Sequence, residues 1–250
     1  MLKVLIKKIL PHFVLKIFHN IKLNLERMTN NSRSVEEVFS DIYLKNTWGG
    51  PKGEYFSGSG SNNGLVVSRY VEAISRYAVH EQFSKKKIVD LGCGDFRVGR
   101  QLLDLCDTYV GVDIVKPLIE SHELRFGTER AKFRHLNIID DDLPDGDVCF
   151  VRQVFQHLSN EQILSVLGKL KKYQLVFITE HYPKENDSTV FNKDKVHGSD
   201  IRLYDNSGVY LTKSPFMLAE AAVANILEVP ASEVEGDFSQ GIIRTFLYRP

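Results

Sequence analysis

The stretch that decides the fold of this 250-residue chain is Val89-Asp90-Leu91-Gly92-Cys93-Gly94-Asp95. It runs from a predicted strand into a helix predicted over residues 99–105, so it forms a strand-to-helix turn. Neither glycine carries a Cβ, and the backbone of such a turn can therefore approach a ligand closely. In an open α/β sheet this turn lies at the carboxyl end of the first strand, where ligands bind.

Strand-like and helix-like segments alternate along the chain from this turn onward. The predicted strands are KIVDLG, YVGVDIV, KFRHLNI, DVCFVRQV and QLVFITEH, and the predicted helices cover residues 99–105, 116–126 and 160–171. This alternation predicts a Rossmann-like α/β fold, with a doubly wound, mostly parallel sheet and helices on both faces. Further helices are predicted over residues 35–44, 65–80 and 215–227, and GIIRTFLYR predicts an antiparallel C-terminal strand.

The charges around the turn indicate which nucleoside cofactor it binds. A dinucleotide fingerprint needs a third glycine at position 97, where this chain has Arg97. A pyrophosphate at this turn would face Asp90 and Asp95, and at roughly 4 Å each repulsion would cost on the order of 4 kcal/mol. S-adenosylmethionine carries an ammonium and a sulfonium instead, and both are attracted by carboxylates. The turn therefore predicts S-adenosylmethionine as the cofactor.

Two later residues complete the predicted cofactor site. Asp113 ends the second predicted strand, 19 residues after Gly94, and a carboxylate there can accept both ribose hydroxyl protons. Asn137 ends the third strand, where its amide can meet the adenine edge. The small residues 57–61 offer backbone N–H groups for closure over the cofactor carboxylate, which makes Ser57 and Ser59 candidates. A plain flexible linker is the alternative for this segment.

The region from about residue 86 to 172 resembles class I S-adenosylmethionine-dependent methyltransferases. Residues 90–94 match the glycine-rich first motif of that family, Asp113 matches its ribose-binding acid, and residues 143–158 match its fourth-strand region. The resemblance implies a cofactor site made of Asp90, Gly92, Gly94, Asp113, Asn137, Ile138, Arg152 and Gln153.

The whole chain more loosely resembles bacterial methyltransferases of surface-polysaccharide biosynthesis, the capsule and O-antigen pathways. The basic N-terminus, Trp48-Gly49-Gly50, residues 57–61, Thr179-Glu180-His181 and Asp200-Ile201-Arg202 carry this likeness. It implies O-methylation of a sugar or a sugar nucleotide, a small-molecule substrate.

Methyl transfer to a hydroxyl needs an aligned acceptor and a base near neutral pKa, which imidazole supplies. His181 follows the fifth predicted strand and is the first candidate, with Glu180 beside it as a group that orients the ring. His157, after the fourth strand, is the competitor, and a capping or packing role is its alternative. The sequence predicts His181 as the general base.

Polar residues that overhang the carboxyl edge of the sheet are candidates for binding the substrate. Residues 182–214 form an insertion at this edge, where loops commonly build a pocket. The candidates are Trp48, Gln156, Asn192, Asp194, His197, Asp200 and Arg202. The histidines and carboxylates lack tight ligand spacing, so no metal is expected.

The first 27 residues differ in charge from the rest of the chain. They hold six lysine or arginine residues and one acid, although the chain as a whole has 32 basic and 32 acidic residues. No apolar stretch reaches the roughly 20 residues that span a bilayer. This segment predicts an amphipathic helix that lies on anionic lipid, or one that packs on the domain or a second subunit as in a homodimer. The balanced net charge gives no reason to expect a nucleic-acid partner.

The sequence therefore predicts three parts: residues 1–27 as a helical extension, 28–84 as a region that closes the site, and 85–250 as the methyltransferase domain. Three widely spaced cysteines indicate reduced thiols and a cytoplasmic protein. If residues 1–27 lie on lipid, the protein is peripheral to the inner face of the membrane. N-methylation of a small amine, a non-catalytic membrane-associated protein and a dehydrogenase are the alternatives. Asp90 and Asp95 disfavour the last.

Overall fold

The computed structural model describes residues 12–230 and 241–250, and a seven-stranded sheet in the order β3-β2-β1-β4-β5-β7-β6 forms its centre. The strands are β1 (Lys87–Leu91), β2 (Thr108–Asp113), β3 (Ala131–His135), β4 (Val148–Arg152), β5 (Leu175–Tyr182), β6 (Val223–Pro230) and β7 (Ile242–Tyr248). The first five are parallel, and β7 and β6 are antiparallel additions beside β5. The Rossmann-like fold predicted from the sequence is confirmed.

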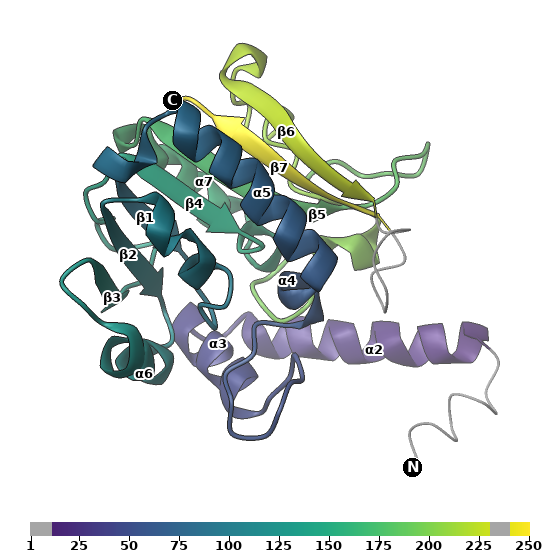
Figure 1. The fold of residues 1–250 in the computed structure, drawn as a ribbon. Coiled ribbons are helices and arrows are strands. Elements are labelled where there is room, and N and C mark those ends of the chain that lie inside the picture. The colour runs from purple at the N-terminus through teal and green to yellow at the C-terminus, as the bar shows by residue number, and fades with distance from the viewer. Residues whose placement is uncertain (1–11, 231–240) are drawn as a thin grey trace.

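Helices cover both faces of this sheet (Figure 1). Helix α5 (Gly64–His80) packs on one face, where Tyr70 and Ile74 join a cluster with Ile88 and Phe177. Helix α7 (Asn160–Lys169) packs on the other face through Ile163. Successive strand residues point to opposite faces, so the apolar run of β1 supplies both clusters, and only a doubly covered sheet buries such a strand completely.

The remaining helices are short or lie at the edges. They are α2 (His12–Asn30), α3 (Val35–Leu44), α4 (Ser59–Asn62), α6 (Lys116–Phe126) and the 3₁₀ turns η1 (Phe83–Lys85), η2 (Gly99–Leu105), η3 (Phe155–His157), η4 (Leu170–Lys172), η5 (Arg202–Asp205) and η6 (Glu220–Ala222). Helix α3 begins at a capping box in which Ser34 and Glu37 bond each other's backbone, which explains its sharp start. Figure 1 shows α2 and α3 outside the sheet, with α3 near the carboxyl ends of the strands.

Two of the predicted elements differ in the structure. The helix predicted over residues 215–227 is wrong, because residues 223–230 form strand β6. That segment pairs with β7 over its whole length, with a register shift between Asn225 and Leu227, and sheet pairing overrides its alanine-rich local preference. Residues 99–105 form the 3₁₀ turn η2 instead of an α-helix. Part of the predicted extension, residues 1–11, lies outside the described residues.

The described residues contain no helix that is long and apolar enough to cross a membrane.

Candidate functional site

A pocket opens at the carboxyl ends of β1, β2 and β4, where the strand order reverses between β1 and β4. Its floor is the turn after β1 and the ends of the two neighbouring strands. Helix α3 and the segment that follows it to residue 62, together called the cover, close over the pocket. They contribute Phe39, Tyr43, Trp48 and Ser57 to its lining. This is the position at which a doubly wound sheet binds its ligands.

The turn after β1 approaches its neighbours too closely for any side chain. Gly92 and Gly94 have φ angles of 75° and 54°, in the left-handed region that favours glycine. A Cβ on Gly92 would lie 2.5 Å from a methyl carbon of Val154, and one on Gly94 would overlap the Ser57 hydroxyl. The two glycines therefore let β1, the loop after β4 and the cover meet around one space.

Asp113 at the end of β2 holds this turn in place. Its Oδ2 accepts the backbone N–H of Gly94 at 3.1 Å, and its Oδ1 accepts that of Val115 at 3.1 Å. The carboxyl group lines the pocket, and burial raises its pKa, although the backbone N–H groups oppose that rise. Each oxygen retains a second lone pair, so the group can still accept ribose hydroxyl protons.

The two carboxylates that bracket the turn have different partners. Asp90 accepts the hydroxyl of Tyr109 at 2.6 Å, and burial raises the pKa of Asp90 to about 6. Asp95 binds the cover instead: it accepts the N–H of Ser57 at 3.0 Å and the amide of Asn62 at 2.8 Å. The Ser57 hydroxyl in turn accepts the N–H of Asp95 at 2.7 Å. Asp95 thus fastens residues 57–62 over the glycine turn.

Arg152 and Gln153 bring buried donors to the pocket lining. Arg152 donates to the carbonyl of Ser61 at 3.0 Å, and its guanidinium lies over the ring of Tyr70 at 5.2 Å. Its Nε and Nη2 atoms, and the Nε2 of Gln153, are buried without a hydrogen-bond partner among the described residues. Buried donors without partners are costly unless a ligand completes them. A carboxylate of a bound ligand could accept hydrogen bonds from these donors of Arg152 and Gln153.

His157 lies in the pocket wall beside the aromatic cover. Its ring centroid lies 5.2 Å from that of Trp48 and 6.3 Å from that of Phe39. Its Nδ1 lies 3.1 Å and 3.3 Å from the carbonyl oxygens of Gly198 and Asp200, so Nδ1 carries the proton and Nε2 is the acceptor. Burial, followed by the charge of Lys195, lowers the pKa of His157 to about 4.

His181, the base predicted from the sequence, is only 3% exposed and is not among the residues that line the pocket. It lies within β5, opposite Ile243 of β7, so strand pairing holds it inside the sheet. The predicted partner Glu180 binds the loop after β4 instead of an imidazole. Its two oxygens accept the N–H groups of Val154, Phe155 and Gln156 at 2.8–3.1 Å. The geometry thus favours His157 over His181.

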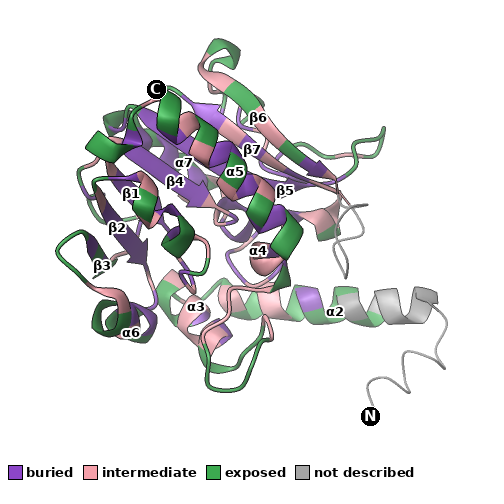
Figure 2. Cartoon of the chain, viewed as in Figure 1, coloured by how far each residue is buried: buried purple, intermediate pink, exposed green. Residues whose placement is uncertain are grey.

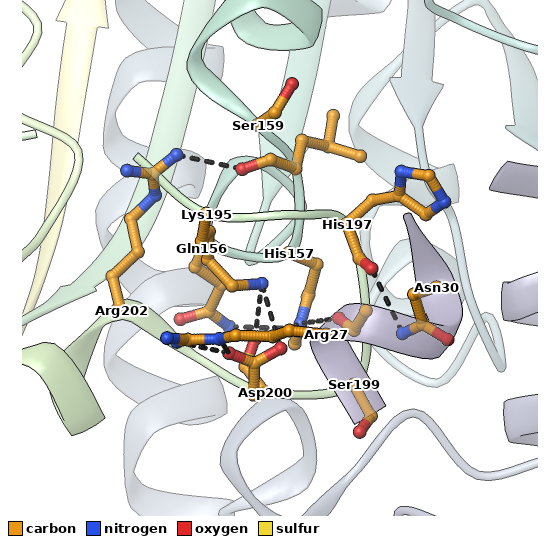
Figure 3. A network of polar contacts seen from close by, with 12 residues as sticks. Arg27, Asn30, Gln156, His157, Ser159, Lys195, His197, Ser199, Asp200 and Arg202 are labelled. Carbon is orange, nitrogen blue, oxygen red and sulfur yellow. Dashed lines mark hydrogen bonds and ion pairs between the residues drawn. The ribbon is translucent and has the colours of Figure 1, made fainter. Parts of the chain in front are cut away.

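The candidates of the insertion form a scaffold outside the pocket lining, buried except for Asp194. Figure 3 shows the part of it around His197, Asp200 and Arg202. Asp200 is paired with Lys195 at 3.1 Å and with Arg27 of α2 at 2.7 Å. Arg202 donates to the carbonyls of Lys193 and Leu158. Asn192 binds backbone groups at residues 210 and 214, and Asp194 caps the start of α7. These side chains are committed to partners within the protein, so direct contact with substrate is not supported.

This scaffold is hydrogen-bonded to α3's preceding loop, to Trp48 of the cover and to the end of α2. His197 lies 3.1 Å from the carbonyl of Arg33, and Trp48 donates its indole N–H to the carbonyl of Ser199 at 3.2 Å. Asn30 donates to the carbonyl of His197 at 3.2 Å. The insertion therefore affects the shape of the pocket indirectly, because it holds the segments that cover the pocket.

Four further candidates differ in their placement. Ile138 and Asn137 line the pocket, but the Asn137 side chain is bonded to Asp140 and to the N–H of Ile139. Ser59 is exposed at the start of α4, and Gln156 is buried behind the lining. The adenine contact predicted for the Asn137 amide therefore competes with a turn inside the protein.

The sequence did not single out several residues of the lining: Phe39, Tyr43, Tyr70 and Val154. Phe39 and Tyr43 are four residues apart on α3 and share one face with Val35, a spacing that is also typical of ordinary core packing. Only the proximity of Trp48 in the following loop offered a signal.

Comparison with known proteins agrees with this geometry. Residues 89–172 match the family described as "methyltransferase domain". This match covers about a third of the chain. The match agrees with S-adenosylmethionine as the cofactor, which the turn after β1 predicts, and with transfer of methyl groups as the activity. None of the curated proteins matches the chain significantly in sequence.

Solved structures share the fold at low sequence identity. A 1,6-didemethyltoxoflavin-N1-methyltransferase of Burkholderia thailandensis has a TM-score of 0.55 and 13% identity, covering 86% of each chain. Magnesium protoporphyrin IX methyltransferase of Synechocystis has a TM-score of 0.52 and 14% identity, covering 87% of this chain and 98% of that one. The N-methyltransferase NodS of Bradyrhizobium japonicum has 0.51 and 10%, covering 74% and 88%. At these identities the likeness shows the fold.

The residues of the pocket fit this cofactor. The glycine turn leaves room for a ligand, Asp113 suits ribose hydroxyls, and the orphan donors of Arg152 suit the carboxylate of the methionine part. Asp90 supplies charge of the sign that the ammonium requires. Within residues 12–230 and 241–250 no group of three His, Cys, Asp or Glu side chains is arranged to hold a metal ion.

Proposed function

We propose that the enzyme methylates a hydroxyl group, with His157 as the group that orients the hydroxyl and accepts its proton. The observation that supports this most directly is the state of the His157 ring. Two carbonyls hold its Nδ1–H, and the ring borders the pocket. Its Nε2 is the acceptor and lies 3.4 Å from the amide nitrogen of Gln156, a contact that the substrate hydroxyl would replace. A histidine held in one tautomer by a backbone carbonyl is arranged for proton transfer at the other nitrogen.

When bound, the cofactor supplies an electrophilic methyl group on its sulfonium. The protein then has to align the acceptor oxygen with that carbon and lower the cost of losing its proton. Nε2 of His157 would take the proton that the acceptor hydroxyl loses. The low pKa of His157, about 4, means that the imidazolium releases this proton readily to water. Alignment therefore accounts for more of the catalysis than basicity.

We propose a sugar as the acceptor, in the biosynthesis of a surface polysaccharide in the cytoplasm. The faces of Phe39 and Trp48 beside His157 suit the apolar face of a pyranose ring. Arg152 is the sole lysine or arginine among the described residues that line the pocket, and the cofactor carboxylate matches it. Three aspartates share the lining. This charge favours an unphosphorylated sugar over a sugar nucleotide, whose pyrophosphate would have to lie outside the pocket.

N-methylation of a small amine is the second candidate. The rings of Phe39, Tyr43 and Trp48 lie together in the cover, and such faces attract ammonium groups. Two of the structures with this fold are N-methyltransferases by name. An amine needs the base less, so dependence of turnover on His157 separates the two candidates.

Mass spectrometry tests the proposal directly. The enzyme is incubated with S-adenosylmethionine and three separate acceptor sets: free sugars and oligosaccharides, sugar nucleotides, and small amines. A mass gain of one methyl group on a free sugar or oligosaccharide is the expected result. Methylation of the amine set alone would overturn the proposed acceptor.

A further inference from the structure

Helix α2 presents an apolar stripe that the rest of the described structure leaves exposed. Phe18, Ile21, Leu25 and Met28 are 51–74% exposed. They follow one another at steps of three, four and three residues, so they share one face of the helix. Scattered exposed apolar side chains are common, but four on one helical face mark an interaction surface.

The opposite face of α2 is fastened to the protein, which fixes the direction of the stripe. Arg27 pairs with Asp200 and Asp205, Asn30 donates to the carbonyl of His197, and Leu23 is only 7% exposed. Figure 2 shows α2 as mostly exposed where it is described, with a short buried segment along it. The stripe therefore faces away from the domain instead of closing onto it.

Charge indicates what covers the stripe. The first 27 residues carry six basic residues and one acid, a net charge of +5. Lys22, on the flank of the stripe, has a side chain that is 75% exposed. Two copies of this segment would repel each other, whereas an anionic bilayer attracts it and accepts apolar side chains at its surface.

We propose that α2 docks the enzyme on an anionic lipid surface, with Phe18, Ile21, Leu25 and Met28 inserted among the lipid chains and Lys22 at the headgroups. The fastened face keeps the domain at a set orientation on that surface. This inference does not depend on which acceptor is methylated.

Vesicle sedimentation tests the inference with the full-length enzyme. Phosphatidylcholine vesicles containing phosphatidylglycerol should bind it, pure phosphatidylcholine vesicles should bind it far less, and added salt should weaken binding. The F18S/L25S variant should bind the anionic vesicles at least about tenfold more weakly, because two inserted side chains are lost. Lys22→Gln should weaken binding about fivefold.

The matched control is V79S/L124S, which alters two side chains that are 82% and 88% exposed elsewhere on the surface. It should bind vesicles like the natural protein. Calorimetric affinity for S-adenosylhomocysteine, unchanged in all these variants, shows that each is folded. If the F18S/L25S variant binds anionic vesicles as tightly as the natural protein does, the inference is overturned. A second result would also overturn it: neither the natural protein nor any variant binds vesicles, and analytical ultracentrifugation shows a dimer of the natural protein that the F18S/L25S substitutions dissociate.

Discussion

Oε1 of Glu180 lies 2.8 Å from the backbone nitrogen of Phe155, in the loop that connects β4 to His157. The same carboxyl group accepts two further backbone N–H groups, those of Val154 and Gln156. Burial raises the pKa of Glu180 to about 8, against the effect of these donors. One fully buried side chain on β5 thus holds the loop that carries the pocket histidine.

Glu180→Gln should lower the free energy of unfolding by about 1–3 kcal/mol, because the amide NH₂ would face a backbone N–H and leave that donor unpaired. Thermal or urea unfolding measures the loss. The control Glu220→Gln alters a side chain that is 81% exposed, and it should change stability by less than about 0.5 kcal/mol. Equal stability of the two variants would contradict the anchoring role.

Asp113→Ala should weaken binding of S-adenosylhomocysteine by about 1–3 kcal/mol, through the loss of charged hydrogen bonds. The structure adds a second reason, because Asp113 also accepts the N–H of Gly94 and holds the glycine turn. Titration calorimetry measures the affinity. Asp145→Ala, at a side chain that is 93% exposed, is the control and should bind normally. NAD should not bind either protein.

Affinity for S-adenosylhomocysteine should fall as the pH drops below about 6. The pKa of Asp90 is raised to about 6, so its charge is present above that pH and disappears below it, together with its attraction for the ammonium. Well below the pKa the affinity should fall by up to about tenfold per pH unit. Asp90→Asn should bind weakly at every pH and lose this dependence. A natural-protein affinity that is constant from pH 7 to 5 would count against the assignment.

His157→Asn should lower kcat by about 10²–10⁴-fold and leave affinity for S-adenosylhomocysteine within about twofold. Asparagine can still donate toward the Gly198 carbonyl, but it lacks the acceptor nitrogen of the ring. His181→Asn, the same change at a histidine outside the lining, should retain kcat within about threefold. The reverse ranking of the two variants would return the role to His181.

The pH profile of the natural enzyme gives an independent measure of this role. Burial lowers the pKa of His157 to about 4, and the charge of Lys195 lowers it further while that of Asp200 opposes the shift, so the ring stays neutral as the pH falls through 6.5. At saturating cofactor, kcat should therefore remain nearly constant from pH 8 to about 5. An acidic limb near pH 6.5 would contradict a buried, neutral His157.

The sequence by itself determined the parallel sheet and the cofactor. Short apolar strands separated by helices can be buried only in a doubly covered sheet, and Asp90, Gly92, Gly94 and Asp113 act through local features: backbone freedom, charge and strand ends. Such features can be read along one strand and its turn. The helix predicted over residues 215–227 was wrong, because pairing between β6 and β7 outweighed local helix propensity.

Only the tertiary structure decided which polar residues face the pocket. His157 and His181 both come at the end of an apolar run of sequence. Nothing in that local sequence distinguishes a ring in the pocket wall from one on β5 that strand pairing with β7 holds in the sheet. The insertion residues Asp200 and Arg202 likewise appeared suited to a substrate, but their partners are Arg27 and Leu158, far away in the sequence. A side chain's direction depends on contacts between distant segments, and a pattern of residue types does not contain that information.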